Sequence, residues 1–91
     1  MNPTRLELIR HRLQEDLRPL ELEIQDDSAQ HRGHAGARDG RGHYSVRIRT
    51  PAFADLSRLE RHRLVYAALG ELMQTDIHAL SIVALAPGET H

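Results

Sequence analysis

Apolar residues near the N-terminus recur with the period of a helix. Five of them are spaced by three or four positions: Leu6, Ile9, Leu13, Leu17 and Leu20. This spacing places them on one helical face. Thr4 and Glu7 have the spacing of a capping box, and Pro19 disfavours helical geometry at the residue before it. The pattern predicts an amphipathic helix over about residues 4–18.

Beyond Pro19, apolar and polar residues alternate, which is typical of strands with one face in contact with solvent. The alternation predicts strands over about residues 20–26 and 43–50. The stretch DIHALSIVAL is apolar at most positions and predicts a third strand over about 76–85. We expect this third strand at the centre of the sheet, because both of its faces would then be covered.

A second helical pattern lies between the last two predicted strands. Ser57 and Glu60 repeat the capping-box spacing, and apolar residues follow at helical intervals. The main helix is predicted over about 58–74, with an extra turn in the segment PAFADL before it. The expected order αββ(α)αβ corresponds to a two-layer α+β domain, with helices on one face of a three-stranded mixed sheet.

Composition limits the class of protein. A length of 91 residues fits one core, so residues 1–91 are expected to form a single domain with a short tail at 87–91. The net charge of -1 argues against a surface that binds nucleic acid throughout. No apolar run approaches the roughly 20 residues that cross a membrane, and the N-terminus lacks the apolar stretch of a signal peptide. We therefore expect a soluble, cytoplasmic protein.

Residues 27–42 form a long predicted loop that is rich in histidine, arginine and glycine. The chain has no cysteine, so any metal ligands must come from histidine or carboxylate side chains. The loop contains His31 and His34, and His78 opens the last predicted strand. If that strand begins beside the loop, two imidazoles could form half of a metal site, completed by a partner, a substrate or water. The alternative is three unrelated surface histidines.

Two other histidines have simple structural explanations, and the sequence lacks catalytic motifs. His43 opens the second strand, where it could cap or pack as easily as bind a ligand. His62 lies three residues before Val65 on the inner helical stripe, which favours a partly buried structural histidine. No nucleophile lies beside a base in a recognisable motif, so we expect no enzymatic activity.

Three segments resemble the BolA family when taken together: HYSVRI at 43–48, RHRLVY at 61–66 and IHALSI at 77–82. The resemblance implies a type II KH-like fold and a monothiol glutaredoxin as partner. It also implies a 2Fe-2S cluster held between the two proteins, with glutathione supplied on the glutaredoxin side. By position, His78 matches the family's ligand histidine and His31 a variable histidine-or-cysteine position, while His34 belongs to a histidine-glycine loop.

From this resemblance we expect a non-enzymatic glutaredoxin partner in iron-sulfur cluster trafficking or in iron and redox regulation. Alone, the chain would be a monomer or a weak homodimer. Some family members are described as DNA-binding transcriptional regulators, and phosphate contacts by five arginines are the alternative: Arg47, Arg49, Arg58, Arg61 and Arg63. One departure is Asp55, where the family usually has glycine two residues after the phenylalanine; aspartate tolerates the left-handed conformation better than most residues.

Overall fold

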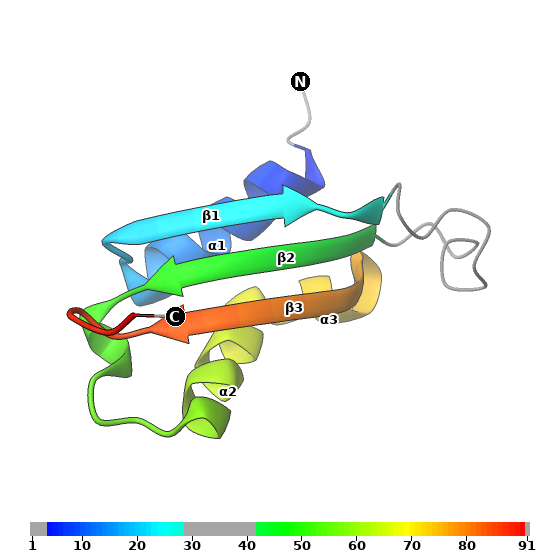
Figure 1. Cartoon of the computed structure of the whole chain (residues 1–91). Coiled ribbons are helices and arrows are strands. Elements are labelled where there is room, and N and C mark those ends of the chain that lie inside the picture. Colours follow the sequence, from blue (N-terminus) through cyan, green and yellow to red (C-terminus); the bar gives the residue numbers. More distant parts are fainter. Residues whose placement is uncertain (1–3, 29–41, 91) are drawn as a thin grey trace.

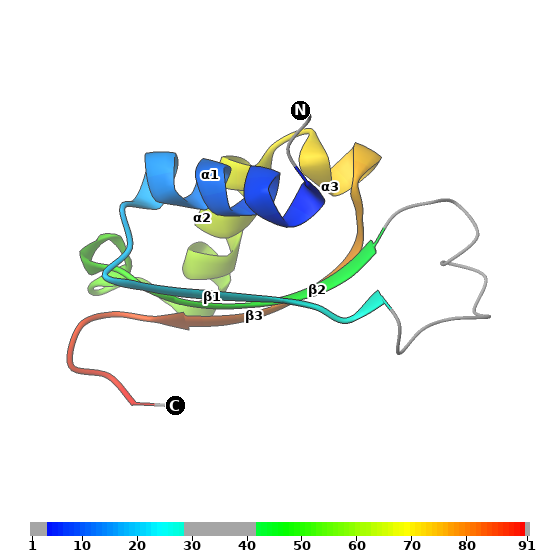
Figure 2. The same cartoon turned by 90° about the horizontal axis from the view of Figure 1, so that it is seen from above.

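The computed structural model describes residues 4–28 and 42–90. Helices cover one face of a three-stranded mixed sheet, and the other face of the sheet carries no helix in the described part (Figures 1 and 2). This confirms the predicted two-layer α+β class. The elements follow in the order α1 (Arg5–Leu17), β1 (Glu21–Asp26), β2 (Gly42–Arg49), η3 (Pro51–Phe53), α2 (Arg58–Leu69), α3 (Leu72–Thr75) and β3 (Ile77–Leu85).

Local signals set both ends of α1, and the Thr4 half of the predicted capping box is present. The Thr4 side chain accepts a hydrogen bond from the backbone N–H of Glu7 at 3.2 Å and so satisfies one of the free donors of the first turn. The helix ends where Arg18 adopts a left-handed conformation with φ 46°, directly before Pro19. Its inner stripe contributes three buried side chains to the core: Ile9, Leu13 and Leu17.

The sheet joins one antiparallel and one parallel strand pair. β1 lies antiparallel to β2, with Ile24 opposite Val46, and β2 lies parallel to β3, with Val46 opposite Ile82. The strand order is β1-β2-β3, so the expected central position of the last strand is wrong and β2 is central. The apolar run of β3 does not need a central position, because Ile82 packs against the core on one face while Val83 on the other face stays only half-buried.

The predicted helix over 58–74 is divided in two. Its start is confirmed, since Ser57 and Glu60 form a complete capping box. The helix stops at Gly70, whose φ of 53° and ψ of -125° break the helical path in a conformation that favours glycine. The expected turn in PAFADL is η3, and Asp55 takes the left-handed conformation with φ 63°.

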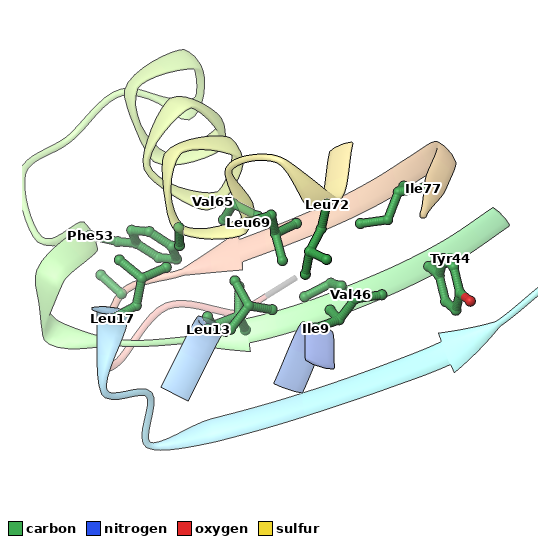
Figure 3. Close-up of a cluster of buried hydrophobic side chains, with 13 residues drawn as sticks. Ile9, Leu13, Leu17, Tyr44, Val46, Phe53, Val65, Leu69, Leu72 and Ile77 are labelled. Atoms are coloured by element: carbon green, nitrogen blue, oxygen red, sulfur yellow. The ribbon is translucent and has the colours of Figure 1, made fainter. Parts of the chain in front are cut away.

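The core lies between the helical layer and the sheet, and most of its side chains are drawn in Figure 3. Aliphatic residues dominate it, with Phe53 as its largest fully buried side chain. Burying each such side chain contributes on the order of 1.5–3 kcal/mol. Within residues 4–28 and 42–90, no helix has both the length and the apolar character that crossing a membrane requires.

Candidate functional site

Three strand termini meet at one end of the sheet. Because β1 and β2 are antiparallel while β2 and β3 are parallel, the end of β1 lies beside the starts of β2 and β3 (Figure 1). His78 is the second residue of β3 and is exposed there. The predicted loop is attached at this same end, between Ser28 and Gly42. His31 and His34 lie outside the described residues, so their approach to His78 stays a prediction.

A second histidine, His43, lies directly against His78. The two ring centroids are 5.1 Å apart and the ring planes are inclined by 55°. His43 is only 9% exposed, whereas His78 faces solvent. The strand pairing shifts between Gly42 and His43, so that Gly42 is paired with Ile77 and His43 with Ala79. The sequence left capping, packing and ligand binding equally open for His43, because a pairing shift of this kind has no local signal.

The start of β2 is held in place by short polar contacts. The N–H of His43 donates to Ser28 Oγ at 3.1 Å, and the N–H of Asp27 donates to the His43 carbonyl at 2.7 Å. A side chain at Gly42 would collide with its surroundings, because a Cβ there would lie 2.7 Å from Tyr44 Cε2 and 2.8 Å from Ser28 Oγ. The backbone that carries His43 is therefore closely packed.

Carboxylates and one phenol lie near the same end of the sheet. Burial raises the pKa of the Tyr44 hydroxyl, and the negative charge of Asp26 raises it further. The phenol therefore stays protonated at neutral pH. Arg5 Nε contacts Asp76 Oδ2 at 3.2 Å, which compensates the charge of one carboxylate two positions before His78.

The donor set fits a shared site better than a complete one. In the described ranges, no three side chains of histidine, cysteine, aspartate or glutamate gather closely enough to hold a metal ion. His78 is accessible, and imidazole is a suitable ligand for iron and zinc. The described residues can thus contribute part of a coordination shell at His78, and further ligands must come from elsewhere.

The predicted phosphate-binding arginines do not form one free surface. Arg47 Nη1 and Arg49 Nε both contact Glu21 Oε2 at 3.3 Å. Arg49 Nη1 also donates to the backbone carbonyls of Ala86 and Glu89 at 3.1 and 2.6 Å. Arg49 therefore holds the C-terminal turn, residues 86–89, against the sheet.

Arg61 is engaged in the same turn. Its guanidinium contacts both carboxylate oxygens of Glu89, at 2.5 and 2.9 Å, and donates to the Ala84 carbonyl at 3.1 Å. These contacts lower the pKa of Glu89 to about 2, chiefly through the hydrogen bond from Arg61. Of the five arginines, Arg58 and Arg63 have exposed side chains and no ion pair with another described residue.

The chain is similar to known proteins in both sequence and structure. A family model described as BolA-like protein matches residues 13–89. The chloroplastic protein BOLA1 of Arabidopsis thaliana is 45% identical over 85 residues, which cover 90% of this chain and 53% of that protein. SufE-like protein 1, chloroplastic/mitochondrial, from the same plant is 45% identical over 86 residues, 89% of this chain and 23% of the relative. The chain thus spans about a half and about a quarter of these two relatives.

The chain is also similar to a solved structure and to a bacterial protein. The BolA domain of SufE1 from Arabidopsis thaliana superimposes with a TM-score of 0.84 at 41% identity, covering 99% of this chain and 100% of that one. The DNA-binding transcriptional regulator BolA of Escherichia coli is 35% identical over 79 residues, which cover 82% of this chain and 72% of the relative.

Proposed function

Because the chain belongs to the BolA-like protein family, we propose that it is a non-enzymatic partner of a monothiol glutaredoxin. In this proposal the two proteins share a 2Fe-2S cluster in the cytoplasm, with glutathione supplied on the glutaredoxin side. The function would be iron-sulfur cluster trafficking or iron and redox regulation.

The observation that carries the proposal is the position of His78. Its ring is exposed, it lies 5.1 Å from the ring of His43, and it occupies the sheet end where the segment with His31 and His34 is attached. An incomplete set of imidazole donors suits a cluster whose remaining ligands come from a partner. A chain without cysteine needs such a partner to supply thiolates.

Each residue has a defined role in this proposal. His78 would donate a ring nitrogen lone pair to one iron, and His31, or His34 in its place, would be the second ligand. When bound, the cluster supplies one-electron redox chemistry, and imidazole ligands in place of thiolates raise its reduction potential. The coordinating nitrogen must be deprotonated, so binding should weaken as the pH falls through the histidine range.

The direct test is a titration of the His78→Ala variant with a cluster-loaded monothiol glutaredoxin. Visible absorption, circular dichroism and reduction potential are followed for the mixture. We expect the wild-type chain to change the spectrum and raise the potential, and His78→Ala to lose both effects. His11→Ala is the matched control, because His11 is exposed on α1. If the His78→Ala mixture keeps the wild-type spectrum and potential, His78 is not a ligand.

The second ligand is tested in the same titration. His31→Ala should weaken the spectral change more than His34→Ala does. If both single variants behave as the wild type and only the double variant loses the change, the segment uses either histidine. A double variant with the full wild-type response would remove both residues from the proposal.

DNA binding is the second candidate, and it rests on the similarity to the DNA-binding transcriptional regulator BolA of Escherichia coli. In this chain Arg58 and Arg63 would be the first phosphate contacts, because Arg49 and Arg61 are engaged by Glu21 and Glu89. A DNA affinity that falls steeply with salt and is reduced in an Arg58→Ala, Arg63→Ala double variant would support it. Weak binding with no dependence on these two arginines would argue against it.

A further inference from the structure

A groove lies between α2 and the free edge of β3, near the end of β3 that is far from His78. Its volume is about 410 Å³, and it is lined by Leu56, Arg58, Arg61, His62 and the strand residues 82–85. We propose that this groove binds an extended, acidic segment of a partner protein, which adds as a fourth strand along β3. The proposal is independent of the cluster site, because the two lie at opposite ends of the strand.

The backbone of β3 has hydrogen-bonding groups to offer along this edge. Among the described residues β3 pairs only with β2, and the Leu85 carbonyl accepts from Thr50 N–H at 3.0 Å on that side. Because successive residues of a strand direct their backbone groups to opposite sides, those of Ala84 and Ile82 point away from β2. Arg61 occupies the Ala84 carbonyl, which leaves the N–H and C=O of Ile82 facing the groove. An added strand can pair with such groups.

The helix that borders the groove carries exposed apolar side chains beside the groove lining. Leu59 is 59% exposed and Tyr66 is 41% exposed, and they are two of the three large apolar residues that stand out in this way among those described. They lie three residues before and four residues after His62, so all three share one helical face. Since His62 lines the groove, this face can cover apolar side chains of an added strand.

The charge of the groove favours a carboxylate on the bound segment. Arg58 forms no ion pair with another residue of the described ranges, and burial together with the charge of Arg58 lowers the pKa of His62. The nearby carboxylates are already engaged, Glu89 by Arg61 and Glu60 by the N–H of Ser57. An acidic residue beside Arg58 would therefore meet a cation that forms no ion pair within the described part of the chain.

The shape of the molecule favours a single extended peptide over a second copy of the chain as the occupant of the groove. α2 begins beyond the free edge of β3, as Figure 1 shows. Antiparallel pairing of two β3 edges would place a second α2 helix on the same face of the joined sheet, beside the first. An extended segment has no helix of its own. A nucleic acid is less well matched, because Arg58 and His62 offer only few phosphate contacts.

The test uses a phage-displayed library of random heptapeptides, selected on the full chain. We expect enriched peptides to alternate apolar residues with aspartate or glutamate. Their synthetic versions should shift the amide resonances of Ile82 and of α2 in ¹⁵N-¹H spectra. Arg58→Glu should weaken their binding about tenfold or more. This variant keeps its fold, because an acidic residue in the first turn of α2 is favourable.

The matched control is Arg63→Glu, which makes the same charge change on the same helix but does not line the groove. It should alter binding by no more than about twofold. Three results would each overturn the proposal: no enrichment of acidic peptides, amide shifts confined to another surface, or equal losses in the two variants. Competition by a thymidine oligonucleotide at equal concentration would assign the groove to nucleic acid, and dimerisation through β3 in sedimentation would assign it to a second copy. None of these five outcomes would change the proposed role of His78.

Discussion

Thr50 is the most deeply buried polar side chain in the described part of the chain, at 1% exposed. Its hydroxyl donates to the Leu17 carbonyl at 2.7 Å and accepts from the N–H of Ala52 at 3.2 Å. One side chain thus joins the end of α1 to the turn that follows β2. The contact satisfies a carbonyl at the helix C-terminus that has no partner within the helix.

We predict that Thr50→Val lowers the free energy of unfolding by about 1–3 kcal/mol, because valine keeps the shape but leaves the Leu17 carbonyl buried without its donor. Urea denaturation followed by circular dichroism measures the change. Thr75→Val is the control: the Thr75 hydroxyl bonds the Glu71 carbonyl at 3.2 Å in an exposed position, and its loss should cost less than about 0.5 kcal/mol. Equal losses in the two variants would contradict the buried role of Thr50.

The sequence predicts some of the site residues and not others, and the difference is physical. His78 could be placed at the start of a strand because the apolar run after it is local. His43 could not be placed against it, because their contact depends on parallel pairing and on the shift at Gly42. Such long-range register is set by the packed sheet and not by neighbouring residues.

For the helices and strands, too, local signals are readable from the sequence and long-range arrangement is not. Capping boxes and alternation depend on residues a few positions apart, so α1 and the three strands begin and end within one residue of the prediction. The end of α2 at Gly70 was missed, since an apolar pattern continues across the glycine to Leu72. Strand order was missed for β3, because an apolar run is equally compatible with an edge whose outer face is half-buried.

The C-terminal turn gives a prediction for the pH dependence of stability. The pKa of Glu89 falls from 4.5 to about 2 through contacts with Arg61 and the N–H of Ala86. When a carboxyl group has a lower pKa in the folded state than in the unfolded state, its ionised form stabilises the fold at pH values above the unfolded-state pKa. This contribution is lost as the pH falls through the folded-state pKa. Glu89→Gln should therefore lower the free energy of unfolding at pH 7, and its difference from the wild type should shrink between pH 4.5 and about 2.

Urea denaturation at a series of pH values provides this comparison. Glu71→Gln is the control, because the Glu71 carboxylate is 74% exposed in its contact with Arg12 and its pair is screened by solvent. A Glu89→Gln difference that stays constant down to pH 2 would mean that the ionised Glu89 carboxylate does not stabilise the turn. The turn would then depend on the bonds that the Arg49 side chain donates to the Ala86 and Glu89 carbonyls.

At the scale of the whole molecule, the position of β2 between two strands sets the order of local stability. Within the ranges 4–28 and 42–90, β2 is paired on both sides, whereas β1 and β3 are paired on one. We predict that amide protons in the middle of β2, such as those of Val46 and Ile48, exchange most slowly with solvent. The amide of Ile82, which points away from β2, should exchange much faster. Hydrogen exchange followed by NMR measures both, and slow exchange at Ile82 would contradict the open edge of β3.

The meeting of three strand termini at one end of the sheet also bears on how substitutions combine. Seven residue steps of β3 separate His78 from Leu85, a distance of roughly 23 Å at the rise of an extended strand. At the Leu85 end, Arg49 donates to the Glu89 carbonyl and Thr50 donates to the Leu17 carbonyl. Sites so far apart, without shared partners, have additive energetic effects. Residues around His78 can therefore be replaced to suit a different partner while compensating changes at the far end restore stability, and neither set constrains the other.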